Sequence, residues 1–127
     1  MLTVVAAFIP KDDQVLIAKR LTGTLSIRGK WEFPGGKVEN GEEEMAAIER
    51  EIQEEFDLKI KALRFLTNYI SEDSSFDLRL YECKCLSSEV SLHDHSEYQW
   101  VKIEELLNYD LAPADIFLAR YLIEKKK

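Results

Sequence analysis

Residues 50–57, REIQEEFD, close a predicted helix with three glutamates, Glu51, Glu54 and Glu55, spaced at i, i+3 and i+4. Side chains at this spacing are neighbours on one helix face, where like charges repel by roughly a few tenths of a kcal/mol per pair. They also lie near the carboxyl end of the helix, where the macrodipole favours cations over anions. Because local electrostatics oppose this arrangement twice, we expect a ligand to compensate it, and a divalent cation is the simplest candidate.

Upstream of these glutamates the sequence has the period of an amphipathic helix. From about residue 42, the apolar residues Met45, Ile48, Ile52 and Phe56 fall at i, i+3, i+7 and i+11. This spacing predicts one buried helix face. The three glutamates lie beside the apolar stripe, at the expected boundary between the core and the solvent.

Acidity is confined to one segment of the chain. Residues 39–57 contain nine acidic residues and one basic residue, Arg50, so the segment carries a net charge of −8. The whole chain carries −7, which leaves +1 for all the other residues. A surface that binds nucleic acid is usually basic, so the segment indicates a cation-binding patch and no nucleic-acid polymer as partner. A solvated acidic face is the alternative that composition leaves open.

The length and composition are those of a globular protein. With 127 residues, of which 46% are hydrophobic and 32% charged, we expect a single domain over residues 1–127, as a monomer or a homodimer. The N-terminal stretch MLTVVAAFIPKDD has no basic leader, and its apolar run ends at Pro10. We therefore expect neither a signal peptide nor a membrane span, and a cytoplasmic location.

Strand and helix periods alternate along the chain. Alternating or continuous apolar runs predict strands, whereas a period near 3.6 predicts helices. The expected strands are 2–9, 14–19, 31–33, 58–70, 76–86 and 97–103, with a loop at 20–30 and helices from about 42 to 56, at 104–109 and at 114–127. This order predicts an α/β fold in which a mixed β-sheet lies between helices on both faces, an α-β-α arrangement.

Two glycines, Gly35 and Gly36, precede the acidic helix at what we expect to be a sharp break after the strand at 31–33. Without a Cβ, the backbone there can approach a phosphate or offer a carbonyl oxygen to a metal ion. A plain tight turn is the alternative interpretation of the pair.

The spacing that begins at Gly36 resembles the signature of the Nudix hydrolases. The chain reads Gly-x5-Glu-x7-Arg-Glu-Ile-x-Glu-Glu-x-Asp-Leu, and the family has glycine where Asp57 stands. Aspartate tolerates the left-handed conformation that ends a helix, so we expect only a small stability cost. The resemblance extends further, because WEFPGGKVENGE (31–42) is similar to the MutT branch and YDLAPADIFL (109–118) to its CTP pyrophosphohydrolases.

The resemblance implies a Nudix fold and a metal site on the acidic helix. Mg²⁺, or alternatively Mn²⁺, would be bound by the carboxylates of Glu51, Glu54 and Glu55 and by the carbonyl oxygen of Gly35, which are the hard oxygen ligands these cations take. Arg50 would pair with a nearby glutamate and hold the metal ligands in place.

The implied reaction is attack of a metal-activated water on a (d)NTP, which yields a (d)NMP and pyrophosphate. The implied substrates are (d)CTP, modified cytosine nucleotides or 8-oxo-dGTP. One carboxylate should act as the general base, and Glu51 and Glu54 are both candidates. A second acid from a later loop often enters the site in the MutT branch. Asp94 is our candidate for that acid, and Glu97 is its competitor.

Three further residues are implied in substrate binding. Arg20, at the end of the second strand, would meet the phosphates or the base, and Lys37, after the glycine pair, would face the phosphates. Asp115 stands where the oxidised-guanine enzymes of the branch have asparagine. An ionised aspartate only accepts hydrogen bonds, which favours the amino group of cytosine or the N–H edge of guanine. A helix N-cap is the alternative role for Asp115, and a surface position for Arg20.

Other functions compete with this interpretation. The chain could be a Nudix-like module that senses a nucleotide without cleaving it, a hydrolase of ADP-ribose or dinucleoside polyphosphates, or a protein that uses its acidic helix only for protein contacts. Hydrolases of ADP-ribose or dinucleoside polyphosphates tend to carry Pro or Tyr sixteen residues after the signature, where this chain has Ser74. A zinc site built from Cys83, Cys85, His93 and His95 is disfavoured, because C-x-C within an alternating strand is not a common zinc spacing.

Overall fold

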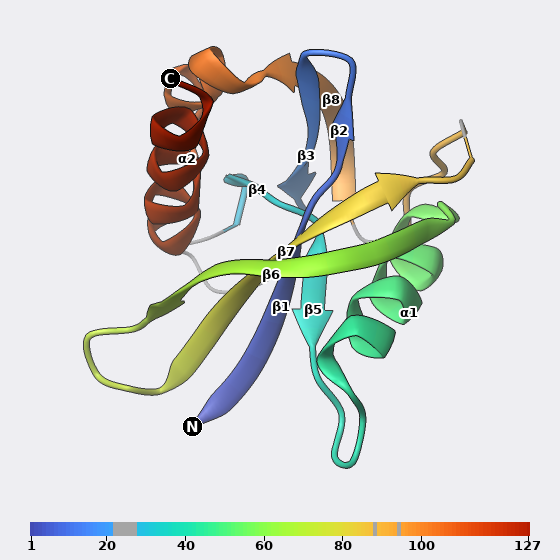
Figure 1. Ribbon diagram of the computed structural model, residues 1–127, viewed down its shortest axis with the longest axis vertical. Helices are drawn as coiled ribbons and strands as arrows, with labels where there is room; N and C mark the ends of the chain where they lie inside the picture. The colour runs from blue at the N-terminus through green and yellow to red at the C-terminus, as the bar shows by residue number, and fades with distance from the viewer. Residues whose placement is uncertain (22–27, 88, 94) are drawn as a thin grey trace.

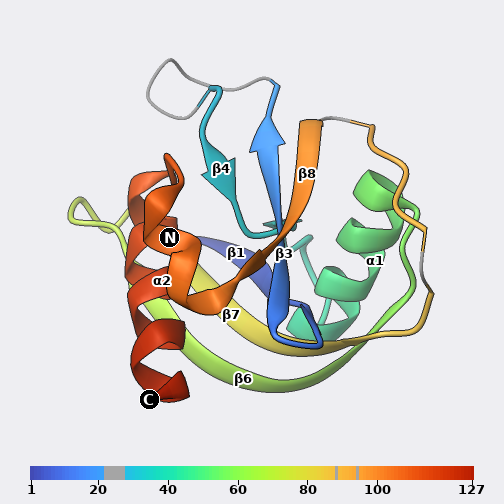
Figure 2. The same ribbon diagram turned by 90° about the horizontal axis from the view of Figure 1, so that it is seen from above.

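Strands from both halves of the chain build two sheets that cross near the centre of the molecule (Figures 1 and 2). The computed structural model describes residues 1–21, 28–87, 89–93 and 95–127. Within these ranges each sheet has four strands, and the helices α1 (Glu44–Phe56) and α2 (Pro113–Lys126) lie on opposite sides. The predicted α/β fold with helices on both faces is therefore confirmed. The division into two sheets was not predicted, because periodicity reports burial but not which strands pair.

The first sheet has the strand order β5-β1-β7-β6. Its strands are β5 (Gly35–Lys37), β1 (Leu2–Phe8), β7 (Phe76–Cys85) and β6 (Ile60–Ile70). Strand β1 runs parallel to β7 and antiparallel to β5, which makes the sheet mixed. The glycine pair, expected at a sharp break, thus forms a short strand against β1.

The second sheet is built around β3 (Gln14–Arg20). This strand pairs antiparallel with β2 (Pro10–Lys11), β4 (Trp31–Glu32) and β8 (His95–Lys102). The pairing brings the end of β3 beside the start of β8, with a register shift between Lys19 and Arg20. Segments far apart in the sequence therefore meet at one end of this sheet.

The helices begin and end close to their predicted bounds. Helix α1 starts at Glu44, two residues later than expected, and the short helix predicted at 104–109 is the 3-10 helix η1 (Ile103–Asn108). Helix α2 starts at Pro113, whose fixed φ suits the first helical turn. No helix in the described ranges is long and apolar enough to cross a membrane.

Alternation along the central strands divides the interior into two hydrophobic cores. On β1, Val5 belongs to the core beneath α1, and the next residue, Ala6, belongs to the core beneath α2. The apolar stripe of α1 is buried as predicted at Ile48, Ile52 and Phe56. The prediction is wrong for Met45, which is 38% exposed because it lies in the first turn of the helix, outside both cores.

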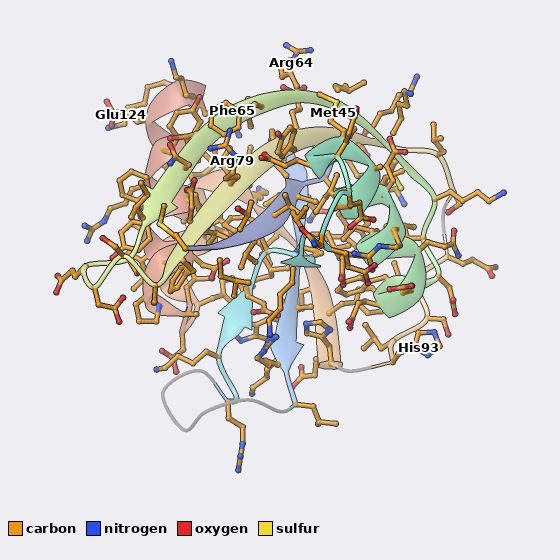
Figure 3. All side chains as sticks on the ribbon, turned by 90° about the horizontal axis from the view of Figure 1, so that it is seen from below. Met45, Arg64, Phe65, Arg79, His93 and Glu124 are labelled. Carbon is orange, nitrogen blue, oxygen red and sulfur yellow. The ribbon has the colours of Figure 1, made fainter. Side chains whose placement is uncertain are left out.

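The start of α1 is tied to the first sheet by a polar cluster on β7. The Arg79 Nε and the Tyr81 hydroxyl both donate to Oε1 of Glu44, at 2.5 and 2.6 Å. The Arg79 guanidinium lies over the ring of Phe65, 4.4 Å from its centroid, and Figure 3 shows these two side chains next to each other. These contacts fix the orientation of α1 on the sheet.

The carboxyl end of α1 is tied to the segment before β8. The backbone N–H groups of Ser91 and His93 donate to the carbonyl oxygens of Phe56 and Glu55, at 2.9 and 3.2 Å. Asp57 has the predicted left-handed conformation, with φ of 50°, and its carboxylate lies 3.0 Å from Nε2 of His93. The segment 91–93 therefore satisfies the last carbonyl groups of the helix.

Candidate active site

Arg50 lies at the centre of the acidic face of α1. Its Nε and Nη2 donate to the two carboxylate oxygens of Glu42, at 2.7 and 3.0 Å. Its Nη1 donates to Glu51 at 3.1 Å and to Glu54 at 2.9 Å. The hydrogen bonds from Arg50 lower the pKa of Glu42, and the same pair raises the pKa of Arg50. The pairing of Arg50 with a nearby glutamate, which the resemblance implies, is present.

The repulsion that the sequence predicts is thus partly offset within the chain. Two of the three glutamates expected to await a cation, Glu51 and Glu54, already accept hydrogen bonds from Arg50. One guanidinium faces four carboxylates, since Glu42 binds it as well and Glu39 lies 3.8 Å from its Nη1. The cluster therefore keeps a net negative charge and still attracts a cation.

The glycine pair brings backbone against this cluster. Gly36 lies opposite Val5 in the β5–β1 pairing, and a Cβ at Gly36 would overlap the carboxylate of Glu51. A Cβ at Gly35 would overlap the carbonyl oxygen of Val5. Both glycines are needed for close approach and not for a left-handed conformation, because neither has a positive φ. Burial beside this backbone raises the pKa of Glu51, despite the neighbouring Arg50.

The three glutamates differ in exposure. The side chains of Glu51, Glu54 and Glu55 are 14%, 60% and 21% exposed. Among the described residues, no three acidic, histidine or cysteine side chains converge as a metal site in their present rotamers. The donors nevertheless fit a hard cation, because they are carboxylate oxygens beside a backbone that only glycine allows so close. Glu54 is the most exposed of the three, although it is bound to Arg50.

A pocket of about 460 Å³ lies beside the glycine pair, between the first sheet and the start of α2. Its walls are largely apolar, and three of its lining residues can carry charge, namely Arg20, Glu32 and Asp115. The same three residues line a smaller adjoining pocket of about 70 Å³ that reaches Gly35 and Gly36. The larger pocket therefore leads to the backbone that contacts Glu51.

Asp115 is buried in the first turn of α2, where its Oδ1 accepts a hydrogen bond of 2.9 Å from the backbone N–H of Phe33. It does not cap its own helix, because the N-cap residue is Ala112 and no side chain caps it. Burial, together with the charge of Glu32, raises the pKa of Asp115 to about 8. The expectation of an ionised Asp115 that only accepts hydrogen bonds is therefore corrected, since a protonated carboxyl group also donates.

Two residues that the sequence reasoning did not assign to the site lie in and behind the pocket wall: Glu32 lines the pocket, and His95 binds Glu32. Glu32 on β4 lies 2.8 Å, through its Oε2, from Nε2 of His95 on β8. The same oxygen lies 3.8 Å from Nη1 of Arg20. The signal for Glu32 was its position between two aromatic residues, Trp31 and Phe33, both of which are buried. His95 gave no signal, because its role depends on the β3–β8 pairing.

The remaining predicted residues are placed as follows. The side chain of Lys37 is exposed, and its carbonyl oxygen accepts a bond of 3.2 Å from Arg50. Glu97, the competitor of Asp94, faces Lys19 at 3.7 Å. Asp94 itself lies outside the described residues. The cysteines and histidines of the disfavoured zinc set do not form a metal cluster among the described residues.

Comparison with known proteins agrees with this geometry. The family description "NUDIX domain" matches residues 1–122. The chain belongs to the NUDIX family. The resemblance read from the signature is therefore confirmed, and the chain is a Nudix hydrolase by family. Nudix hydrolases generally use a divalent metal such as Mg²⁺.

Several relatives of this Nudix chain are similar over nearly their whole length. It is 35% identical, over 91% of its length and 87% of the relative, to an Escherichia coli protein named CTP pyrophosphohydrolase. It is 37% identical, over 88% of its length and 81% of the relative, to a Mycobacterium tuberculosis protein with the provisional name 8-oxo-dGTP diphosphatase 2. The solution structure of the E. coli ORF135 protein matches with a TM-score of 0.83 at 32% identity, covering 99% of this chain and 91% of that one.

Proposed function

We propose that this Nudix protein hydrolyses nucleoside triphosphates to nucleoside monophosphates and pyrophosphate. The observation that carries the proposal is the pocket of about 460 Å³ whose adjoining part reaches Gly35 and Gly36, next to Glu51. An apolar pocket with few polar groups suits a nucleobase. A glycine backbone beside an acidic cluster suits a phosphate chain that carries a metal ion.

We propose that Mg²⁺, or Mn²⁺ in its place, binds to the carboxylates of Glu51, Glu54 and Glu55 and to the carbonyl oxygen of Gly35. A bound Mg²⁺ ion supplies a water of lowered pKa and offsets negative charge on the phosphate oxygens. Arg50 restrains Glu51 and Glu54 through its hydrogen bonds and is itself held by Glu42. Glu51, Glu54 and Asp94 remain the candidates for the general base.

We propose that Asp115 and Glu32, which line the pocket, recognise the nucleobase. A protonated Asp115 donates one hydrogen bond while its Oδ1 keeps the bond from Phe33. Together with Glu32, which accepts, the pocket then offers a donor and an acceptor side by side. Cytosine presents a ring acceptor next to an amino donor, so this pair suits (d)CTP and modified cytosine nucleotides, with 8-oxo-dGTP as the second candidate. Arg20 and Lys37 are proposed to contact the phosphates.

The biological setting is proposed from the same features. A cytoplasmic enzyme of this kind, acting as a monomer or homodimer over residues 1–127, would remove unwanted nucleotides from the pool before they are used. The names of the E. coli and M. tuberculosis relatives support a nucleotide substrate of this class.

The test is a panel assay of pyrophosphate release with Mg²⁺ and CTP, dCTP, 5-methyl-dCTP, dGTP, 8-oxo-dGTP and ADP-ribose. We expect release from a cytosine nucleotide at the highest kcat/KM. Tight nucleotide binding without cleavage of any substrate would instead establish a sensor. Preferential cleavage of ADP-ribose would move the chain to another branch of the family.

A further inference from the structure

One buried ring connects the pocket with the acidic helix. The imidazole of His95 has only 4% of its side-chain surface exposed. Its Nε2 lies 2.8 Å from Oε2 of Glu32, which lines the pocket, and its Nδ1 lies 3.9 Å from Oε2 of Glu55 on α1. These two carboxylates belong to different elements, β4 and α1, and the ring comes from a third element, β8. A single side chain therefore faces a carboxylate of each half of the site.

The orientation of this ring is fixed by its surroundings. The imidazole stacks on Phe56, the last residue of α1, with centroids 5.0 Å apart and an angle of 25° between the planes. The backbone of His95 pairs with Arg20 at the register shift of β3 and β8. Stacking and strand pairing together leave the ring little freedom to turn. If either carboxylate moves, its distance from the ring nitrogen therefore changes.

The Nδ1 atom of His95 is buried and has no hydrogen-bond partner among the described residues. A buried polar atom in this state costs roughly 1–3 kcal/mol. The carboxylate oxygen that it faces, Oε2 of Glu55, is 3.9 Å away, beyond hydrogen-bond distance. A small rotation of Glu55, or one bridging water, would satisfy the nitrogen. His95 is therefore one of the groups that Glu55 faces.

We infer that His95 is a positioning residue that couples the nucleobase pocket to the metal-binding helix, since it holds Glu32 through Nε2 and faces Glu55 through Nδ1. The inference rests on the proposed function, because it assigns a base to the pocket and a metal ion to α1. A base that turns Glu32 changes the hydrogen bond to Nε2 and, through the charge distribution of the imidazole, the environment that Nδ1 offers to Glu55. Coupling of two binding sites is reciprocal, so metal binding also alters selection of the base.

Two substitutions of His95 test the contacts of its two ring nitrogens separately. A glutamine side chain places its amide near the position of Nε2, whereas an asparagine places it near the position of Nδ1. His95→Gln therefore keeps a partner for Glu32 and removes the group that faces Glu55. His95→Asn does the reverse. His93→Gln is the matched control, because it makes the same change two residues earlier on a side chain that is 52% exposed.

The readouts are Mn²⁺ affinity without nucleotide and the ratio of CMP to UMP affinity, both by calorimetry, with thermal midpoints to confirm folding. We expect His95→Gln to weaken Mn²⁺ binding about fivefold and to keep the base ratio within about twofold, on the scale of ordinary coupling between sites. His95→Asn should keep Mn²⁺ affinity and reduce the base ratio about fivefold. The control should change neither quantity.

The inference is overturned if both variants change the two readouts alike, which is the behaviour of a residue that only fills space, or if neither variant changes them. Both readouts measure binding and not turnover. If the wild-type protein releases no pyrophosphate from any nucleotide, the proposed function fails, whereas the opposite effects of the two variants still decide the role of His95.

Discussion

The two halves of the candidate site are built in opposite ways. The acidic face of α1 is local in the sequence, and its partly exposed carboxylates share one arginine, Arg50. The pocket draws Arg20, Glu32 and Asp115 from three elements, with His95 from a fourth bound to Glu32, and of these Asp115 and His95 are buried. The exposed end of the acidic face, at Glu54, is open to a cation in solution, whereas burial raises the pKa of Asp115 in the pocket to about 8. The first half suits metal binding and the second suits selective recognition.

Removing one charge from the acidic face should have the largest effect. We expect Glu54→Gln to lower kcat at least about 100-fold, the scale of disabling a metal-activated nucleophile or its base. Steady-state kinetics with the best nucleotide of the panel, together with Mn²⁺ affinity, measures this effect. Glu105→Gln removes the same charge from an exposed position on η1 and serves as the control. Equal activity of the two variants would show that the acidic helix serves another purpose.

Adding a methyl group at Gly36 should displace the carboxylate of Glu51 without touching any charge. We expect Gly36→Ala to reduce kcat/KM about 10- to 100-fold, because a small misplacement of reacting groups has effects of this order. Gly41→Ala is the contrast, since its Cβ meets no atom within 4 Å but its φ of 81° is strained for alanine. That variant should lose thermal stability and keep its turnover. Normal activity of Gly36→Ala would refute the close approach of Glu51.

The buried Asp115 in the pocket should make the free energy of unfolding depend on pH. The pKa of Asp115 is raised to about 8, so the folded state holds this proton more tightly than the unfolded state. Its contribution is fully present below the ordinary aspartate pKa and is lost as pH rises toward 8, at up to roughly 1 kcal/mol per pH unit. Urea unfolding of wild type and Asp115→Asn between pH 4 and 9 measures the difference. Parallel curves for the two proteins would show an ordinary, ionised aspartate.

A substitution at the carboxyl end of α1 should have the smallest effect on stability and activity. Asp57→Gly restores the residue of the family signature, which suits the φ of 50° but loses the contact with His93. These changes oppose each other, because glycine removes strain while an exposed polar contact of this kind contributes about 0–1 kcal/mol. We expect the free energy of unfolding to change by less than about 1 kcal/mol, with kcat unaltered. A larger loss in Asp57→Gly than in His93→Ala would show that Asp57 does more than pair with His93.

Much of the fold could be predicted because the residues that determine it are close in sequence. The apolar stripe of α1, the end of the helix at Asp57 and the positions of the long strands all follow from period and spacing. Errors occurred where local signals competed. Gly35 and Gly36 were assigned to a break because glycine usually weakens strands, whereas here they form β5, against β1 and the carboxylate of Glu51.

The sequence by itself determined the acidic helix, the glycine pair and the family, because fixed spacing on one helix dictates which side chains are neighbours. Only the tertiary structure decided that Arg50 already binds two of the three glutamates, that Glu32 and His95 belong to the site, and that Asp115 favours its protonated form. The physical reason is that contacts between distant segments depend on strand pairing, and the shift of a buried pKa depends on which segments cover the group.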